Sequence, residues 1–482
     1  MGEATSFTKS LNLFDSTALV AGSMIGSGIF IVSADVARQV GSPGWLMVTW
    51  VLAGFLTIIA ALSYGELAGM YPKAGGQYVY LKEAYNPLIG FLYGWTLFLV
   101  IQAGTIAAVA MAFAKFFGIL FPWVSEEVVW IRAGFFKFGP VQIVAILSIV
   151  VLTWINSRGI RSGKKVQNAF TTGKVLLLVA FIVVGLIFAS DAGAIAANKK
   201  VFWQPVQEGV GGADIPLSGL ALMAAIGMAM VGTLFSSDAW NNITFTAGEV
   251  INPRKNIPLS LVLGTLFVTV LYLLANTVYL TALPLRGEPG GDGFVGRGMQ
   301  YALNDRLGTA VLSGIVGNHA VVIMAVFIVI STFGCNNGLI LSGARVYFAM
   351  ARDQLFFRSC GKLNNHGVPL AGLILQGVWA SLLCLSGTYG QLLDYVIFAV
   401  LIFYVLTISG IFILRMKHPD IERPYRAFGY PVVPALYILL ATAIMVILLI
   451  FKPGYTWPGL IIVILGIPVY FLWQRQWNNN RE

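Results

Sequence analysis

Twelve apolar runs, each long enough to cross a membrane, follow one another along the 482-residue chain. A helix needs about 20 apolar residues to span a bilayer, and only helices and closed barrels satisfy their backbone groups within lipid. Charged residues form only 10% of the chain, against about 25% in a soluble domain. We therefore predict an all-α polytopic membrane protein with twelve transmembrane helices. The runs lie at about 14–40, 44–71, 88–118, 138–157, 165–190, 216–247, 257–282, 315–351, 368–386, 389–414, 431–451 and 455–474.

The loops between the runs carry most of the basic residues. We expect no soluble domain, so residues 1–482 are predicted to form one transmembrane domain. The net charge of +10 does not indicate nucleic-acid binding, because alternate loops hold most of the Lys and Arg, as in Arg158–Arg161 and Arg415–Arg426. By the positive-inside rule these loops face the cytoplasm. This predicts both termini inside and a multi-pass protein in the lipid bilayer of the plasma (inner) membrane.

The first run contains Ala21–Phe30, with three glycines and two serines where a membrane helix normally carries Leu and Val. Because glycine weakens a helix, we predict a break near Gly26 and a restart near Ile29. The restart leaves the N–H groups of Ser27, Gly28 and Ile29 unpaired at the positive end of a helix dipole. That is a site for a small anion such as a carboxylate. The alternative is a helix-packing face of small residues.

The sixth run contains a second interruption, Gly232–Asn242, which includes the carboxylate of Asp238. Apolar helix precedes it, and Ile243–Val250 can resume the helix after it. Two breaks five helices apart are typical of inverted five-helix repeats, whose unwound stretches face each other across a binding site. The predicted first repeat is about 14–190, the second about 216–414, and two extra helices follow at about 431–474.

Lys174 lies about ten residues into the fifth run. A lysine at that depth is costly unless it is paired or solvated, which indicates a functional role. The alternative is that its side chain snorkels to the interface, since Lys164 and Lys165 mark a nearby membrane edge.

The other reactive side chains do not indicate an enzyme. They show no metal-ligand spacing, no disulfide framework and no nucleophile–base constellation. We therefore expect no catalytic residue, no metal and no cofactor. The residues concerned are Cys335, Cys360, Cys384, His319, His366 and His418.

Five stretches carry a more specific signal, and their order along the chain matters. They are Gly26–Phe30 in the first helix, Glu66–Tyr78 in the second, Leu234–Asn241 in the sixth, Glu249–Pro258 after it and Arg345–Asp353 in the eighth. These motifs resemble the amino acid–polyamine–organocation (APC) superfamily, and within it the L-type amino-acid exchangers, whose mammalian members are light chains of heteromeric transporters. The resemblance covers nearly the whole chain. It implies the LeuT-type 5+5 inverted repeat plus two C-terminal helices.

The resemblance implies a substrate site for an L-amino acid at the two breaks. The Ser27 and Gly28 amides would bind the substrate carboxylate, and carbonyls near Met24, Ile25 and Phe235 would bind its ammonium. Phe235 would also cover the substrate side chain as an aromatic lid. The full set of implied substrate-binding residues is Met24, Ile25, Gly26, Ser27, Gly28, Phe235, Ser236, Asp238 and Asn241.

Lys174 matches a helix-five lysine that is similar across the L-type branch and lies where related transporters bind sodium. A fixed ammonium supplies the charge that a sodium ion supplies elsewhere. The resemblance thus implies transport that is independent of sodium.

The chain departs from the light chains at two places. Light chains carry a cysteine in the second external loop that links to a glycoprotein heavy chain, and no cysteine lies between 118 and 138. We therefore expect no disulfide-linked heavy chain. In addition, Ser236–Ala239 replaces the commoner Ala-Tyr-Gly-Gly, so neutral-substrate specificity does not transfer directly.

Asp238 has three interpretations. It caps the resumed half-helix by accepting hydrogen bonds from the Asn241 or Asn242 amide, carries a proton, or selects the substrate. Among the light chains, the branch that handles dibasic amino acids and cystine has an aspartate at the matching place. The third interpretation predicts neutral substrates, extending to cationic ones, and excludes acidic ones.

These observations predict a secondary transporter of L-amino acids that works by alternating access, as a sodium-independent exchanger. The first alternative is a proton-coupled amino-acid or polyamine symporter on the same fold. A membrane sensor or channel is the second, although no signalling domain appears and two converging breaks suit binding better than a continuous pore.

Overall fold

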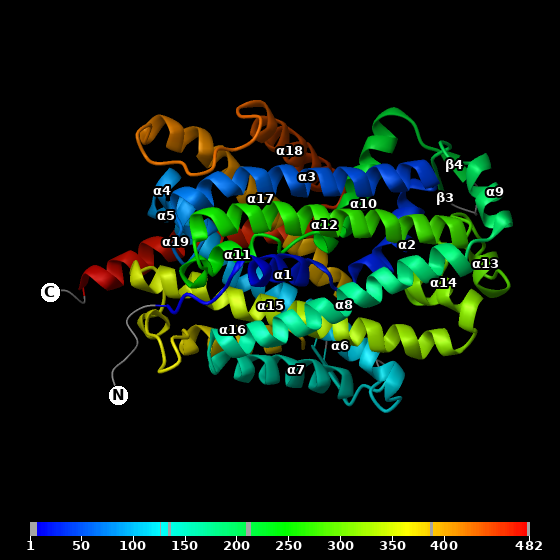
Figure 1. The fold of residues 1–482 in the computed structure, drawn as a ribbon, viewed down its shortest axis with the longest axis horizontal. Helices are drawn as coiled ribbons and strands as arrows, with labels where there is room; N and C mark the ends of the chain where they lie inside the picture. Colours follow the sequence, from blue (N-terminus) through cyan, green and yellow to red (C-terminus); the bar gives the residue numbers. More distant parts are fainter. Residues whose placement is uncertain (1–6, 126, 134–135, 209–213, 386–388, 480–482) are drawn as a thin grey trace.

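The computed structural model describes residues 7–125, 127–133, 136–208, 214–385 and 389–479 as a bundle of long helices with two short hairpins (Figure 1). The hairpins pair β1 (Ile131–Ala133) with β2 (Phe136–Phe138), and β3 (Val206–Glu208) with β4 (Asp214–Pro216), both antiparallel. The helices are α1 (Leu13–Met24), α2 (Gly28–Val40), α3 (Pro43–Met70), α4 (Gln77–Ala84), α5 (Pro87–Thr96), α6 (Gln102–Leu120), α7 (Pro140–Ser157), α8 (Ile160–Phe188), α9 (Ala192–Lys200), α10 (Gly219–Ser236), α11 (Asn242–Phe245), α12 (Pro253–Ala282), α13 (Gly293–Arg297), α14 (Leu307–Val316), α15 (His319–Arg352), α16 (Leu370–Leu383), α17 (Tyr389–Lys417), α18 (Val432–Phe451) and α19 (Pro453–Asn479).

Most of these helices are long and apolar enough to span a membrane. Ten such helices occur among the described residues, and α1 with α2 forms an eleventh span that bends by 42° at its break. The ninth predicted run, 368–386, is the remaining one and holds only the 14 residues of α16. At 1.5 Å per residue this is about 21 Å, shorter than the bilayer core. The prediction of an all-α polytopic membrane protein is confirmed.

The helices begin where the sequence supplies starting signals. Proline occupies the first helical position of α3, α5, α7 and α12, where its missing N–H costs nothing. α1 starts with a capping box: the Asn12 side chain accepts from the Asp15 amide, and the Asp15 carboxylate accepts from the Asn12 amide.

Helices from the two predicted repeats pack in corresponding pairs. α3 of the first lies along α12 of the second, α6 lies along α15, and α2 packs against α10 (Figure 1). Such pairing is expected of an inverted repeat, although the repeat boundaries remain a prediction. In Figure 1 the described chain begins and ends at the same end of the bundle, whereas α9, α13 and the β3–β4 hairpin lie at the opposite end.

The second interruption differs from the prediction on its C-terminal side. We expected a helix over Ile243–Val250, but α11 ends at Phe245 and a short 3₁₀ turn, Ala247–Glu249, follows. The hydroxyls of Thr244 and Thr246 bond to carbonyls three residues earlier, and such bonds compete with a regular helix.

A buried ion pair fastens the end of the bundle where the described chain begins. Arg345 of α15 donates two hydrogen bonds to the Glu249 carboxylate, at 3.0 and 2.9 Å, and both side chains are 1% exposed. The amides of Ser10 and Leu11 donate to the backbone oxygen of Glu249. The pair therefore joins the segment before α1, the turn after α11 and α15.

Removing one partner of this ion pair should lower the free energy of unfolding more than replacing both partners. Arg345→Met leaves the Glu249 carboxylate buried without a partner, which costs roughly 3–5 kcal/mol, whereas replacing both ions with apolar groups is often neutral. We expect the purified Arg345→Met protein to unfold at a clearly lower temperature, and the double variant Arg345→Met/Glu249→Met to recover much of the loss. Equal thermal stability of Arg345→Met and wild type would contradict this account.

Candidate functional site

The break between α1 and α2 leaves five successive carbonyls, Gly22 to Gly26, without regular helical partners, and side chains bond to each of them. Lys174 Nζ donates to the oxygens of Gly22 and Ile25, the latter at 2.7 Å. The Cys335 thiol faces the Ser23 oxygen at 3.0 Å, and the Tyr272 hydroxyl donates to the Met24 oxygen at 3.0 Å. The remaining oxygen, that of Gly26, accepts from the Ser331 hydroxyl at 3.1 Å. The broken helix is thus held by its neighbours rather than by its own backbone.

Lys174 is fully buried in α8. Besides the two carbonyls of the first span, its ammonium lies 3.4 Å from the Ser331 oxygen of α15. Three N–H donors therefore meet three carbonyls, and no carboxylate of the described residues pairs with this ammonium. The snorkelling alternative is wrong, because the charge lies at the break in the first span and not at a membrane edge.

Tyr272 of α12 connects the two interruptions. Its hydroxyl lies between the Met24 and Ser236 oxygens, at 3.0 and 3.1 Å, and its one proton is shared between these two acceptors. Both carbonyls end a half-helix, one in α1 and one in α10. The two breaks predicted from the sequence therefore lie next to each other.

The start of α2 packs beside α10 and has backbone N–H groups without acceptors among the described residues. Ser27 is the N-cap, and no described residue accepts a hydrogen bond from the N–H of Gly28 or Ile29. A Cβ added at Gly28 would lie 2.2 Å from Ser236 Oγ, so only glycine fits there, whereas one added at Gly26 would meet only Cys335 Sγ, at 3.6 Å. The helix dipole and the amides together suit a carboxylate.

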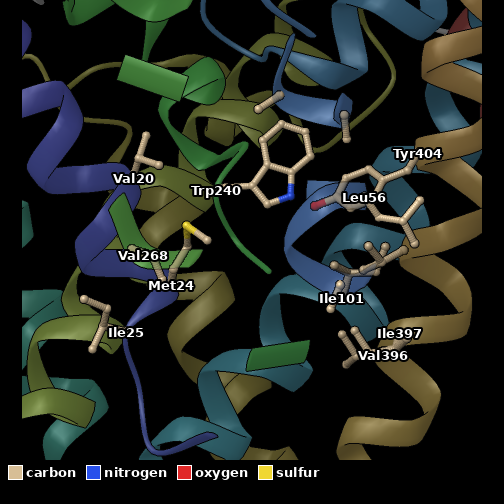
Figure 2. Packing of buried hydrophobic residues seen from close by; sticks show 14 of the residues in the cluster. Val20, Met24, Ile25, Leu56, Ile101, Trp240, Val268, Val396, Ile397 and Tyr404 are labelled. Atoms are coloured by element: carbon tan, nitrogen blue, oxygen red, sulfur yellow. The ribbon is translucent and has the colours of Figure 1, made fainter. Parts of the chain in front are cut away.

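Asp238 points away from this start of α2. The Tyr404 hydroxyl of α17 donates to Asp238 Oδ1 at 2.6 Å, and no basic side chain of the described chain pairs with the carboxylate. The Asn242 amide donates to the Ala239 backbone oxygen, and no described hydrogen bond joins the Asn241 or Asn242 amide to the Asp238 carboxylate, so the structure does not support the capping interpretation. Figure 2 shows Trp240 between Met24 on one side and Tyr404 on the other.

Asp238 lines a polar cavity of about 20 Å³, room for about one water molecule. Asn241 also lines it and donates to Gln77 Oε1 at 2.9 Å. The π-helical turn Leu97–Ile101, between α5 and α6, forms another wall. No residue of α1 or α2 lines this cavity, so an amino acid that reaches both parts of the site requires the helices to move.

The predicted site residues therefore form two groups. Met24, Ile25, Gly26, Ser27, Gly28, Ser236 and Lys174 gather at the first break, while Asp238 and Asn241 face α17 and α4. Phe235 is half-buried against the main apolar core. Sequence reasoning missed Tyr272, Ser331, Cys335 and Tyr404, which are single polar or aromatic residues on otherwise regular helices.

The described side chains include no group of three His, Cys, Asp or Glu residues that would hold a metal ion. The site instead offers backbone amides, backbone carbonyls, one buried ammonium and one carboxylate. Groups of these kinds suit the two charges of a zwitterion.

A polytopic helical bundle whose two broken helices meet at a buried polar centre defines a secondary transporter. The chain belongs to the amino acid permease family, whose sequence profile matches residues 11–470. It is 28% identical to the large neutral amino acids transporter small subunit 2 of Homo sapiens, over 98% of this chain and 83% of the relative. The b(0,+)-type amino acid transporter 1 of Homo sapiens is also 28% identical, over 98% and 89%. The Asc-type amino acid transporter 1 of Mus musculus is 27% identical, over 98% and 82%.

These relatives confirm the predicted superfamily and its L-type branch. They also confirm amino-acid transport as the functional class predicted from the motifs.

Two constraints favour glycine at position 28: the close packing of Ser236, and the expected approach of a carboxylate to the backbone amide. Substitutions can separate these two constraints. Gly28→Ala alone should abolish uptake, because its Cβ meets Ser236 Oγ. In Gly28→Ala/Ser236→Gly that side chain is gone, so the protein should fold normally. Alanine at this position keeps the backbone N–H, but its methyl group obstructs a carboxylate that binds against the backbone. If the Gly28 amide also binds a carboxylate, uptake by the double variant should therefore remain below about a tenth of wild type, as when a charged hydrogen bond is lost.

Gly26→Ala supplies the complementary measurement, because its Cβ has room. Loss of uptake by this variant in a stable protein would report on the ligand and not on packing. Full recovery of uptake by the double variant would mean that Gly28 serves packing alone.

Proposed function

We propose that this permease moves L-amino acids across the plasma membrane by alternating access, as a sodium-independent exchanger with both termini in the cytoplasm. The observation that carries the proposal is the first break, where the Gly28 and Ile29 amides have no acceptor among the described residues and Lys174 holds the Gly22 and Ile25 carbonyls. The amides receive the substrate carboxylate. Its ammonium binds at the carbonyl side of the same break, near Met24 and Ile25.

The small cavity beside Asp238 supports alternating access. A volume of about 20 Å³ holds about one water molecule, which is less than an amino acid needs. Substrate therefore enters and leaves only when the helices that carry the two breaks shift relative to their neighbours. Tyr272 bonds to both breaks, so they shift as one unit.

Uptake into proteoliposomes tests the proposal directly. We expect labelled amino acid to enter in sodium-free buffer, and amino acid loaded inside the vesicle to stimulate entry. A strict sodium requirement would contradict the exchanger. Uptake that needs a pH gradient and ignores internal amino acid would instead favour the proton-coupled symporter.

Lys174 supplies the charge that makes sodium unnecessary. Lys174→Ala removes the donor from the Gly22 and Ile25 carbonyls, and losing a charged hydrogen bond costs about 1.5–3 kcal/mol, or about tenfold or more in rate. We expect exchange to fall by that factor while the protein stays folded. Lys165→Ala, an exposed lysine on the same helix, is the matched control.

Thermal unfolding of the same variants distinguishes turnover from folding. If Lys174→Ala melts much earlier and regains full exchange at a temperature where it is folded, then Lys174 is structural and the charge-replacement proposal fails.

Asp238 is proposed to select substrates at the side-chain end of the site. Its carboxylate has a tyrosine hydroxyl as partner and no ion-pair partner among the described residues, so it attracts the cationic end of Lys or Arg and repels Glu. The expected range is neutral amino acids, extended to cationic ones, without acidic ones. A relative named as a b(0,+)-type transporter is compatible with this range.

Competition for neutral amino-acid uptake tests this role. Asp238→Asn should weaken competition by Arg about tenfold or more, the worth of a hydrogen bond to a charged group, and should keep neutral uptake. Tyr404→Phe removes the hydrogen bond but leaves the charge, so it should keep Arg competition. Strong competition by Glu, or equal Arg competition in Asp238→Asn and wild type, would remove Asp238 from the selectivity site.

We also propose that the chain works without a disulfide-linked heavy chain. A relative bears the name small subunit, which marks it as part of a larger assembly. In this chain all three cysteines, Cys335, Cys360 and Cys384, are buried and unpaired, so none is placed to link to a partner.

A further inference from the structure

A groove runs along the bundle between α7 and α16, and none of the predicted substrate-site residues lines it. Its volume is about 510 Å³. Along α7 it extends from Ile146 to Ser157, about 17 Å at 1.5 Å per residue, and along α16 it extends beyond the end of the helix, from Leu370 to Leu385. This length accommodates much of one acyl chain.

The walls of the groove suit hydrocarbon. Most of the lining side chains are aliphatic, and Val150, Ile374 and Val378 are each about half exposed. Two of its three hydroxyl side chains, Ser157 and Ser381, donate to carbonyls of their own helices. The groove therefore offers little to a polar ligand.

One end of the groove is basic. Trp154 lines the groove and is 55% exposed, and the Arg158 guanidinium lies 3.9 Å from the centroid of its ring. No carboxylate of the described chain pairs with Arg158. This end of the groove lies at the same end of the bundle as the N-terminal segment, since the Lys164 ammonium, in the helix that follows Arg158, donates to the Ser10 oxygen.

The turn that carries Arg158 is fixed in place. The Asn364 side chain, from the loop before α16, donates to the Ser157 oxygen at 2.9 Å. This contact ties the ends of the two helices that form the groove. A stacked guanidinium keeps its N–H groups available for bidentate contact with a phosphate.

We propose that the groove binds an anionic phospholipid, with one acyl chain between α7 and α16 and the phosphate on Arg158. An apolar channel that ends in an unpaired cation complements both parts of such a lipid. A neutral lipid complements only the apolar groove and not the cation. A transmembrane helix of a partner protein has no need of the cation.

Native mass spectrometry of the full-length protein, titrated with phosphatidylglycerol or phosphatidylcholine, tests the proposal. Wild type should bind phosphatidylglycerol more tightly. Arg158→Gln should weaken its binding about fivefold, since one basic residue near a membrane surface is worth about 1 kcal/mol. Val378→Trp, which fills the groove from an exposed position, should abolish the specific adduct.

Two matched variants serve as controls. Arg161→Gln removes another exposed charge from the same basic turn, and Val446→Trp adds the same bulk to α18, away from the groove. Both should bind phosphatidylglycerol as wild type does. Size-exclusion chromatography checks that every variant is folded.

Four outcomes would overturn the proposal. They are equal binding of the two lipids by wild type, equal weakening by Arg161→Gln and Arg158→Gln, unchanged binding by Val378→Trp, and a second polypeptide that occupies the groove of wild type and is lost in Val378→Trp. The last outcome would make the groove a protein interface.

Discussion

The Lys174 ammonium is the interaction on which the centre of this permease depends. A lysine at the middle of a membrane costs about 3 kcal/mol by insertion scales, and a broken helix in lipid leaves carbonyls that need donors. The ammonium and the carbonyls satisfy each other, because Lys174 donates to the oxygens of Gly22, Ile25 and Ser331. The first span, α8 and α15 therefore meet at one charge. The carbonyl end of the break is held in this way, whereas the amides at its other end, at Gly28 and Ile29, have no acceptor among the described residues.

Tyr272 extends this arrangement to the second break, and the Glu249–Arg345 pair fastens the end of the bundle where the described chain begins. The broken helices are thus tied to each other through Tyr272, and to the surrounding helices through α8 and α15. A transporter needs both kinds of contact. The contacts through Tyr272 keep the two breaks together. The contacts with α8 and α15 join the breaks to the helices relative to which they shift during transport.

The position of Asp238 separates two functions that the sequence places only a few residues apart. Ser236 packs on Gly28, whereas Asp238 accepts from Tyr404 on the far helix. One short interruption therefore contacts Gly28 on one side and a polar cavity on the other. An amino acid with a long cationic side chain has a carboxylate at one end and a positive charge at the other. We therefore propose that its carboxylate lies at Gly28 and its side-chain end at Asp238.

The sequence by itself determined the membrane class, eleven of the twelve predicted spans and the two breaks, because each follows from local chemistry: apolar length, and glycine or polar residues at bilayer depth. It also identified Lys174 and Asp238 as charged side chains whose burial at bilayer depth costs free energy unless they have partners. It did not reveal their partners, since Tyr272, Ser331, Cys335 and Tyr404 lie on regular helices far away in the chain, and no local pattern marks them. Only the tertiary structure decided that Lys174 is not at the membrane edge, that Asp238 faces α17 instead of capping α11, and that Gly28 is needed for packing, because each of these depends on which helices lie side by side.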